Sequence, residues 1–557
     1  MTFAPQKDEL TGTINSVISR DIVKGVWNDG DNTYLTIRQE ARNALPLSSE
    51  SSTLIVPLTN PNVDFVQFDK SFIRINATVN FKPTGYAAAS GADNADATKN
   101  IFVFIGLKNS TDCIGEYAVY HKGKQVSGTL QSNGTVESFL YHTYRSESDL
   151  MNKTGIHSIA EQIQKYDYLS SCGEYISLSE IQSKAGGTFG INFQFDIPFT
   201  DILIFQQFKS YPAALFGDLE IRFKFNPNAF VSLNVHPIDS LKKISMESES
   251  APVKKLGNEF EIYAKDYTKE YTQLGDTFKG IIHAKIETAS GLTSWLANSQ
   301  GLTISTGDVK FDYSAISITD CYSVIVGFRA KPEALERMRS KFEKNPWVKF
   351  SQNVNYLQFS QQPSTTGLNI TQQVYLNNTT DFAILFPTTA HEAGGTVFKN
   401  PMLTDLAITA MNRRYPEVGL DTCSPEFIHL MLNSSRGTPR KEYANSLCYP
   451  RWKDDGEYGS DCDLTSFVAT LKVERPSAMG LICDGLDSKG YQVPIRLQAT
   501  RKYTGEHDAY CKNATSMPPP ILITVNDSYF IFNAKDGGQC IYSNRPFNET
   551  VSTFMRQ

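Results

Sequence analysis

The chain has 557 residues, a net charge of −6 and 20% charged residues, while aromatic residues make up 11%. The slight acidic excess excludes a polybasic nucleic-acid binder, because counterion release needs clustered cations on the protein. The low charge and many aromatic residues exclude global disorder. No apolar run approaches the roughly 18 residues of a membrane span, and the longest clean stretch is Ile101–Leu107.

The N-terminal segment lacks the pattern of a secretion signal. Met1–Arg20 has neither a basic start nor an apolar centre. We therefore expect a product that is made in the cytoplasm and not secreted. The odd number of cysteines, nine, includes no C-x-x-C pair and predicts reduced, buried thiols. Within this terminus, Thr13–Val23 has a narrow apolar stripe, and we expect a short helix packed under the body of the protein.

Period-two alternation dominates the first half of the chain. Apolar residues alternate with polar ones in the ranges 73–81, 189–199 and 219–225. This pattern is typical of antiparallel strands with one face in a core and the other in water.

Later strands are less cleanly alternating. They are predicted at 309–318, 322–328, 354–359, 381–386, 403–411, 427–432, 467–473, 493–499 and 521–532. Helices are few: Pro332–Phe342 is the clearest, with a proline in the first turn and an apolar stripe, and His157–Tyr166 is the second. The sequence thus predicts an all-β protein with short helices set in loops.

A polar, charged segment from Pro237 to Lys255 divides the sequence into two β-rich parts. We interpret it as a linker (237–255) between a first unit at 51–236 and a second at 256–535, followed by a tail at 536–557. Long connections such as Lys82–Lys99 and Arg436–Asp461 are typical of Greek-key or jelly-roll wiring rather than of simple meanders.

The sequence carries no recognisable catalytic motif. The eight histidines form no H-x-H or H-E-x-x-H pair, and there is no nucleophile elbow, phosphate-binding lysine loop or dinucleotide-binding glycine pattern. The doublets Gly186-Gly187, Gly394-Gly395 and Gly537-Gly538 are interpreted as turns. We expect no enzyme, no catalytic residues and no cofactor.

One acidic loop is a candidate calcium site, because calcium binds several carboxylates in a flexible loop. The spacing differs from that of an EF-hand, and a solvated loop is the simpler interpretation. Its residues, around Gly456 and Gly459, are Asp454, Asp455, Glu457, Asp461 and Asp463.

Several runs of sequence, taken together in their order and spacing, carry a family resemblance. In the first half they are Asn62–Phe81 and Leu215–Phe225; in the second half they are 376–387, 398–401, 414–416, 463–467, 474–477 and 484–486. The chain resembles the double jelly-roll major capsid proteins of tailless double-stranded DNA viruses of eukaryotes, in the virophage, Polinton and polinton-like group.

The resemblance implies two eight-stranded jelly rolls standing side by side. Three copies would form a pseudo-hexameric capsomer, and many capsomers an icosahedral shell, which places the protein in the virion. The implied partners are further copies of the chain, a penton or vertex protein and minor cement proteins, without specific nucleic-acid binding. Residues 1–50 would form an arm at the capsomer base, a candidate for contact with an internal membrane.

Two features depart from the family pattern, and two alternatives stay open. The family does not require the cysteine-rich stretch Cys423–Cys540, and the second half is long enough to carry an insertion, for which we choose Arg436–Asp461. The first alternative is a carbohydrate-binding or carbohydrate-cleaving β-sandwich protein. The second is a minor capsid or vertex protein. A stable trimer without a small ligand would distinguish the major capsid protein from a lectin or hydrolase.

Overall fold

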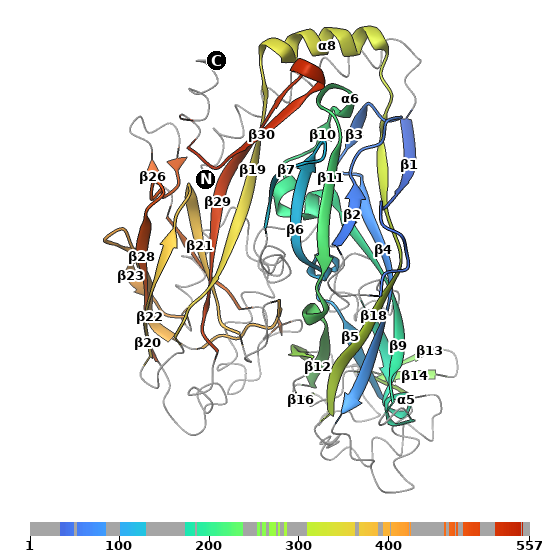
Figure 1. The fold of residues 1–557 in the computed structure, drawn as a ribbon. Helices are drawn as coiled ribbons and strands as arrows, with labels where there is room; N and C mark the ends of the chain where they lie inside the picture. Colours follow the sequence, from blue (N-terminus) through green and yellow to red (C-terminus); the bar gives the residue numbers. More distant parts are fainter. Residues whose placement is uncertain are drawn as a thin grey trace, which may run out of the picture.

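Two β bodies stand side by side in the computed structural model, and helix α8 (Pro332–Lys344) joins them at one end (Figure 1). The helix matches the predicted range and begins at the expected proline. None of the helices among the described residues is long and apolar enough to cross a membrane. The structure describes residues 34–48, 53–84, 101–129, 173–183, 187–237, 253–256, 259–262, 267–274, 277–278, 283–286, 309–361, 367–387, 394–401, 403–422, 424, 462–463, 467–473, 475–476, 483–501, 518–546 and 549.

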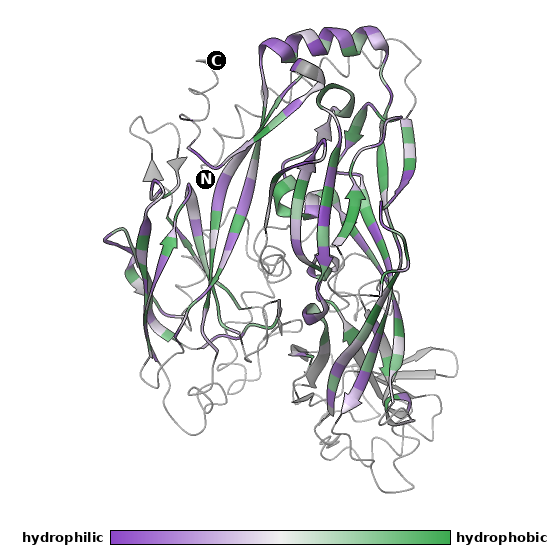
Figure 2. Cartoon of the chain, viewed as in Figure 1, coloured by the Kyte–Doolittle hydropathy of each residue, from purple (hydrophilic) through white to green (hydrophobic). Residues whose placement is uncertain are grey.

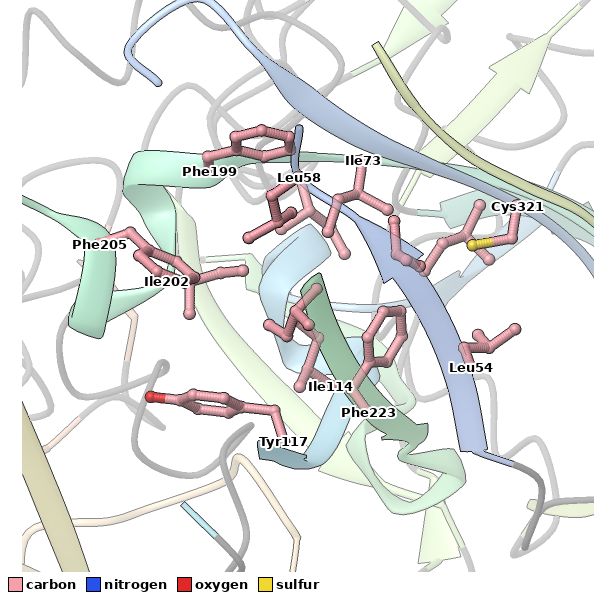
Figure 3. Packing of buried hydrophobic residues seen from close by; sticks show 14 of the residues in the cluster. Leu54, Leu58, Ile73, Ile114, Tyr117, Phe199, Ile202, Phe205, Phe223 and Cys321 are labelled. Carbon is pink, nitrogen blue, oxygen red and sulfur yellow. The ribbon is translucent and has the colours of Figure 1, made fainter. Parts of the chain in front are cut away.

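The first body encloses its core between two antiparallel sheets. The larger has the order β10 (Ser210–Tyr211), β3 (Phe65–Gln67), β18 (Val309–Phe328), β4 (Phe72–Thr84) and β9 (Phe189–Pro198), with β1 (Tyr34–Glu40) and β16 (Thr277–Phe278) also paired to β18. The smaller has the order β2 (Thr53–Pro57), β11 (Leu219–Phe225), β6 (Ile114–His121) and β7 (Lys124–Thr129). Leu54, Ile73, Ile114 and Phe223, from four different strands, meet in this core (Figure 3).

A third sheet extends the first body away from α8. Its order is β13 (Val253–Leu256), β14 (Glu259–Ile262), β17 (His283–Ile286), β5 (Ile101–Gly106), β12 (Val231–Pro237), β15 (Tyr267–Gln273) and β24 (Cys462–Asp463), with β8 (Gly173–Ser177) paired to β5.

The second body also has two sheets around one core. One has the order β19 (Trp347–Gln358), β29 (Ile521–Asn533), β21 (Thr379–Leu385) and β25 (Ala469–Lys472), with β30 (Gln539–Ser543) added to β29. The other has the order β20 (Gly367–Tyr375), β28 (Gln492–Arg501), β22 (Leu403–Ala410) and β23 (Arg413–Leu420). A short pair, β26 (Arg475–Pro476) and β27 (Cys483–Asp484), stands apart.

Short helical turns occupy the connections, as the sequence predicted. They are η1 (Ser110–Cys113), α5 (Leu178–Ser183), η4 (Phe199–Asp201), η5 (Leu203–Phe205), α6 (Ala213–Phe216), η6 (Pro227–Ala229) and η9 (Lys535–Gly537). The predicted helices Thr13–Val23 and His157–Tyr166, the predicted strand 427–432 and the loop Arg436–Asp461 lie outside the described residues.

Alternation along the sequence places side chains as predicted. On β4, Ile73, Ile75, Val79 and Phe81 are fully buried, while the polar residues between them lie on the half-exposed face. β9 pairs with β4 along its whole length, from Phe72 opposite Pro198 to Phe81 opposite Phe189. Successive residues point to opposite faces of a sheet, and Figure 2 shows the resulting bands of hydrophobic and hydrophilic residues along these strands.

The division between the two bodies differs from the predicted linker at 237–255. The strands on either side of that segment, β12 and β13, belong to the same sheet. β18, which we had placed in the second unit, pairs with β4 and β1 and buries Ile316, Ile318 and Ile325 in the first core. The chain passes to the second body at α8 instead. A polar segment marks a surface connection, but its composition does not say whether the strands it connects share a sheet.

Strand lengths and strand counts also differ from the prediction. The two strands predicted at 309–318 and 322–328 form one 20-residue strand, β18, whose register shifts at two irregularities. The described strands form sheets of seven, four and eight in the first body and of five and four in the second, rather than two sets of eight.

Candidate functional site

The structure gives no support to a metal or catalytic cluster in the regions it describes. No group of three or more His, Cys, Asp or Glu side chains is placed to hold a metal ion among the described residues. Four members of the predicted calcium loop, Asp454, Asp455, Glu457 and Asp461, lie outside them. The fifth, Asp463, is in β24, opposite Lys269 of β15 in a parallel pair.

The described histidine and cysteine side chains have structural roles. His121 is buried and its Nε2 lies 2.6 Å from the carbonyl oxygen of Phe216; burial lowers the pKa of the imidazole. Cys113 and Cys321 are buried free thiols, as predicted, and Cys540 is a half-buried free thiol. Burial raises the pKa of Cys321 to about 12, so this thiol stays protonated and unreactive at neutral pH.

The most distinctive site is a cluster of aromatic rings between the two bodies, here called the aromatic junction. Phe216 of α6 stacks on Trp347 of β19, with ring centroids 5.2 Å apart and an interplanar angle of 6°. Tyr211 contacts Phe532 of β29 at 5.4 Å. All members are buried in the first core although three belong to strands of the second body; they are Phe208, Tyr211, Phe216, Phe342, Trp347, Phe530 and Phe532.

The turn between β29 and β30 contacts the same end of the junction. Gly538 has a φ of +105°, and a Cβ there would lie 2.1 Å from the backbone oxygen of Phe216, so only glycine allows this approach. Lys122, in the turn between β6 and β7, donates from Nζ to the carbonyl oxygens of Gly537 and Gly538, the latter at 2.8 Å. The predicted glycine turn at 537–538 is therefore a contact between the bodies.

Polar contacts join the bodies along the middle of β19. Ser351 Oγ donates to the carbonyl oxygen of Ile204 at 2.8 Å, and Lys349 Nζ to that of Gln207 at 3.4 Å. Lys349 is 2% exposed. Burial, reinforced by repulsion from Lys209, lowers the pKa of Lys349 to about 7, because a buried ammonium group loses its hydration.

Two of the motifs that carry the family resemblance meet in the second body. Asn378 adopts a positive φ of 51°, donates from Nδ2 to the carbonyl oxygen of Asp527 at 3.2 Å and accepts from the amide of Gly485 at 2.9 Å. A Cβ at Gly485 would lie 2.3 Å from the backbone of Asn378. The motifs at 376–382 and 484–486 therefore fix the start of β21 against β29.

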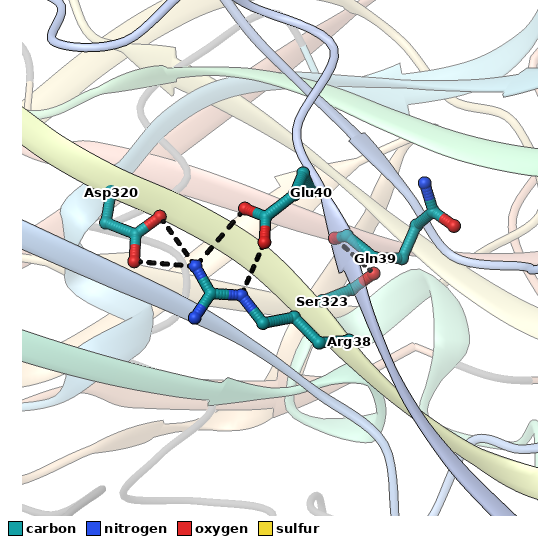
Figure 4. A network of polar contacts seen from close by, with 5 residues as sticks. All are labelled: Arg38, Gln39, Glu40, Asp320 and Ser323. Carbon is teal, nitrogen blue, oxygen red and sulfur yellow. Dashed lines mark hydrogen bonds and ion pairs between the residues drawn. The ribbon is translucent and has the colours of Figure 1, made fainter.

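Charged side chains lie on the exposed face of the seven-stranded sheet that contains β1 and β18. Arg38 of β1 forms ion pairs with Glu40 and with Asp320 of β18 (Figure 4). Its guanidinium also lies 3.6 Å from the ring centroid of Tyr322. The hydrogen bonds and charges of the two carboxylates raise the pKa of Arg38. Exposed ion pairs contribute little to the free energy of unfolding. We therefore expect this network to orient β1 against β18 while adding little to its stability.

Among the described residues, most of the exposed large apolar side chains lie on or beside the β20–β28–β22–β23 sheet. Tyr375 ends β20, opposite Gln492, and Tyr491 directly precedes β28. Met411 lies in the turn between β22 and β23, at the same end of the sheet. Tyr491 is 76% exposed and Tyr375 50%. We call Tyr375, Met411 and Tyr491 the exposed apolar end; such patches mark surfaces that meet other molecules.

Sequence reasoning missed the aromatic junction. Its members come from three separate segments, 208–216, 342–347 and 530–532, and no local period links them. One signal was available: β29 is buried at every position except its last, and its sequence reads as an almost continuous apolar and small-polar run. A strand buried on both faces must meet a partner on each side, which indicates a second layer beyond its own core.

Comparisons with solved structures return structures of viral capsids and capsid proteins. The chain is similar to the mavirus major capsid protein (11% identity, 93% of this chain and 92% of that chain, TM-score 0.43) and to the Sputnik virophage structure (11%, 94% and 90%, 0.43). It is also similar to the PBCV-1 virus capsid (9%, 92% and 97%, 0.42). No family model and no curated protein matches the sequence.

Proposed function

We propose that this chain is the major capsid protein of a double-stranded DNA virus, whose two bodies act as one building block of an icosahedral shell. The observation that carries the proposal is the way the bodies are joined. Strands of the second body complete the first core through the aromatic junction, so the pair behaves as one rigid unit. A shell subunit needs this rigidity, since its shape must be the same in every copy.

We further propose that both bodies are jelly rolls, that is, eight-stranded hairpins folded over so that the first strand pairs with the last. In the second body the antiparallel pairs are β19 with β29, β20 with β28, β21 with β25 and β22 with β23. This is the complete nested order. The two sheets, β19–β29–β21–β25 and β20–β28–β22–β23, each take alternate pairs of the hairpin.

The first body supports the same interpretation with an alteration. Its nested pairs are β2 with β11, β4 with β9, β5 with β8 and β6 with β7. Here the β5–β8 pair lies in the third sheet rather than beside β11. The long strand β18 is an addition to the eight strands of the hairpin.

In this proposal three copies associate into a pseudo-hexameric capsomer, and capsomers tile the shell. The exposed apolar end of the second body is the surface that we expect to meet another copy. β1 and β30 lie within the ranges predicted as an arm (1–50) and a tail (536–557), but they are paired to β18 and β29 in the sheets of the two bodies. An arm and a tail in the rest of those ranges, vertex and cement partners, contact of the arm with an internal membrane, and calcium at the acidic loop remain predictions. No observation on the described residues favours a sugar-binding or sugar-cleaving function, and two fused bodies do not fit a single-roll vertex protein.

The test is the mass of the full-length protein, measured by light scattering together with negative-stain microscopy. We expect a species of three times 62.1 kDa with a hexagonal outline. The variant Tyr491→Lys should shift this species toward monomer, because it places a charge on an exposed apolar surface without touching either core. The variant Lys489→Ala, in the same turn, is the matched control and should remain trimeric. A monomer at every concentration, alone and with virion partners, would contradict the proposal.

A further inference from the structure

One segment of the second body reaches into the first at the end of the interface away from α8. It is the range 394–400, which begins with a glycine doublet that the sequence analysis interpreted as a turn. Thr396 in this segment is fully buried. Two residues later, Phe398 packs in the second core, and its carbonyl oxygen accepts from the amide of Phe467 at 3.2 Å.

The first body receives this segment with the side chain of Gln273, the last residue of β15. Gln273 is 4% exposed. Its Nε2 donates to the carbonyl oxygens of Asn228 and, at 3.0 Å, Phe230. Its Oε1 accepts from the backbone amide of Thr396 at 3.1 Å. One carboxamide therefore uses both donor hydrogens within its own body and its acceptor across the interface.

A second carboxamide supports the first. Asn226 Nδ2 donates to the carbonyl oxygen of Gly394 at 3.1 Å, and Asn226 Oδ1 accepts from the amide of Asn228 at 3.1 Å. Gly394 has a φ of +119°, and a Cβ there would lie 2.7 Å from Asn226 Oδ1. A Cβ on Gly395 would lie 3.1 Å from Gln273 Oε1. The glycine doublet thus allows the backbone to approach both amides.

These contacts connect the two cores by a short path. Phe230 belongs to the first core and Phe398 to the second, and Gln273 and Thr396 lie between them. At the α8 end the bodies share buried rings, whose contacts are apolar, together with the hydrogen bonds from Lys122 to the 537–538 turn. At this end they share directional hydrogen bonds between buried groups, which fix position and cost free energy when one partner is lost.

We propose that Gln273 is a positioning residue that sets the angle between the two bodies by holding the 394–400 segment. Removing its carboxamide leaves both cores folded and the α8 end closed, but releases the remote end, so that the bodies splay about the aromatic junction. The structural claim is independent of assembly. Its consequence, a capsomer subunit of uniform shape, rests on the proposed function.

The experiment compares full-length protein with the variant Gln273→Met, which keeps the length of the side chain and removes its donors and acceptor. Gln194→Met, on the exposed face of β9, is the matched control. Hydrogen–deuterium exchange should accelerate about tenfold in peptides covering 394–400, with exchange in β4 and β21 unchanged. Small-angle scattering should show a larger radius of gyration for Gln273→Met and no change for Gln194→Met.

Three outcomes would overturn the proposal. An unchanged exchange rate at 394–400 would show that the Gln273 carboxamide does not hold this segment in place. Faster exchange there with an unchanged radius of gyration would confine Gln273 to a local loop. Faster exchange in β4 and β21 as well would make it a general stability residue. The variant Gln273→Glu keeps an acceptor for Thr396 but turns a buried carboxylate oxygen toward the carbonyl oxygens of Asn228 and Phe230, and should accelerate exchange at least as much as Gln273→Met. If the unmodified protein never forms trimers, the proposed function is refuted. The exchange and scattering results for Gln273→Met can still be interpreted in that case.

Discussion

The first and second bodies follow the same nested order of strand pairing, but they fill their cores differently. The first core contains two networks of ring contacts, one that includes Phe81 and Phe193 and one that includes Phe216 and Trp347. The second core is mostly aliphatic, with Phe386 and Phe467 as a ring pair within it. Ring packing is geometrically specific. We therefore expect the first body to keep a defined shape by itself and the second body to pack against it.

The comparison extends to the last strand of the nested pairs in each body, β11 in the first and β29 in the second. In the first body, β11 ends inside its own core. In the second, β29 continues past its core, and its last residues enter the first body as Phe530 and Phe532. The second body therefore depends on the first for the burial of these rings, whereas most of the first core is made by its own strands. We expect the second body to lose order first when the junction is weakened.

The largest expected effect is that of Trp347→Ala. It removes the ring that stacks on Phe216 and opens a cavity between the bodies, at a cost of about 3–5 kcal/mol. Because the junction couples the bodies, unfolding in denaturant should change from one transition to two, the second body melting first. Fluorescence and circular dichroism measured together would check this. Tyr375→Ala, at a half-exposed ring outside the junction, is the control and should keep one transition. A single, shifted transition for Trp347→Ala would mean that contacts outside the junction couple the bodies.

A smaller loss of stability should distinguish Gly538, which contacts the aromatic junction, from Gly490, which lies in an open turn. Gly538→Ala forces a Cβ against the backbone of Phe216, whereas at Gly490, with a φ of +83°, nothing lies within 4 Å. Gly490→Ala should cost about 1 kcal/mol, the ordinary penalty for a left-handed residue, and Gly538→Ala at least about twice as much. Thermal denaturation of both variants gives the comparison. Equal losses would show that β30 shifts freely away from the first body.

The middle of the interface should respond to pH through Lys349. Its folded pKa of about 7 lies below the unfolded value, so between about pH 7 and 10.5 the unfolded chain binds more protons. Stability from this group therefore rises with pH across that window, with a slope of about 1.4 kcal/mol per pH unit at most, and the full penalty applies below pH 7. Lys349→Met should be more stable at pH 7 and should lose the slope. A slope that persists in this variant would assign it to another group.

The sequence predicted the elements far better than their partners, and β18 shows why. Its apolar residues alternate, so its existence was predictable from local burial. Nothing in residues 309–328 says that they pair with β4, which precedes them by more than 200 positions in the sequence. Pairing is decided by complementary faces in three dimensions, and a polar segment at 237–255 was therefore mistaken for the division between bodies.

The functional-site residues were likewise predicted only where a local sequence pattern marked them. Motifs such as Asn378 and Gly485 were found because their order resembles that of a family, and the structure adds the reason, a backbone contact that needs a glycine. The aromatic junction and the Gln273 contact had no such signal. Each consists of residues that form no motif within their own segments. They come into contact only when the two folded bodies pack together.

The smallest expected effect compares two arginines on the exposed face of the first body. Arg74 of β4 makes a two-pronged ion pair with Asp196 of β9, at 2.6 and 2.7 Å, and is half-buried; Arg38 of β1 is exposed. Arg74→Met should cost about 0.5–1 kcal/mol, screened only in part by salt, and Arg38→Met should leave the denaturation midpoint unchanged. Urea denaturation at low and high ionic strength measures both. A loss for Arg38→Met as large as that for Arg74→Met would mean that β1, an edge strand, contributes as much to the first body as the strands that enclose its core.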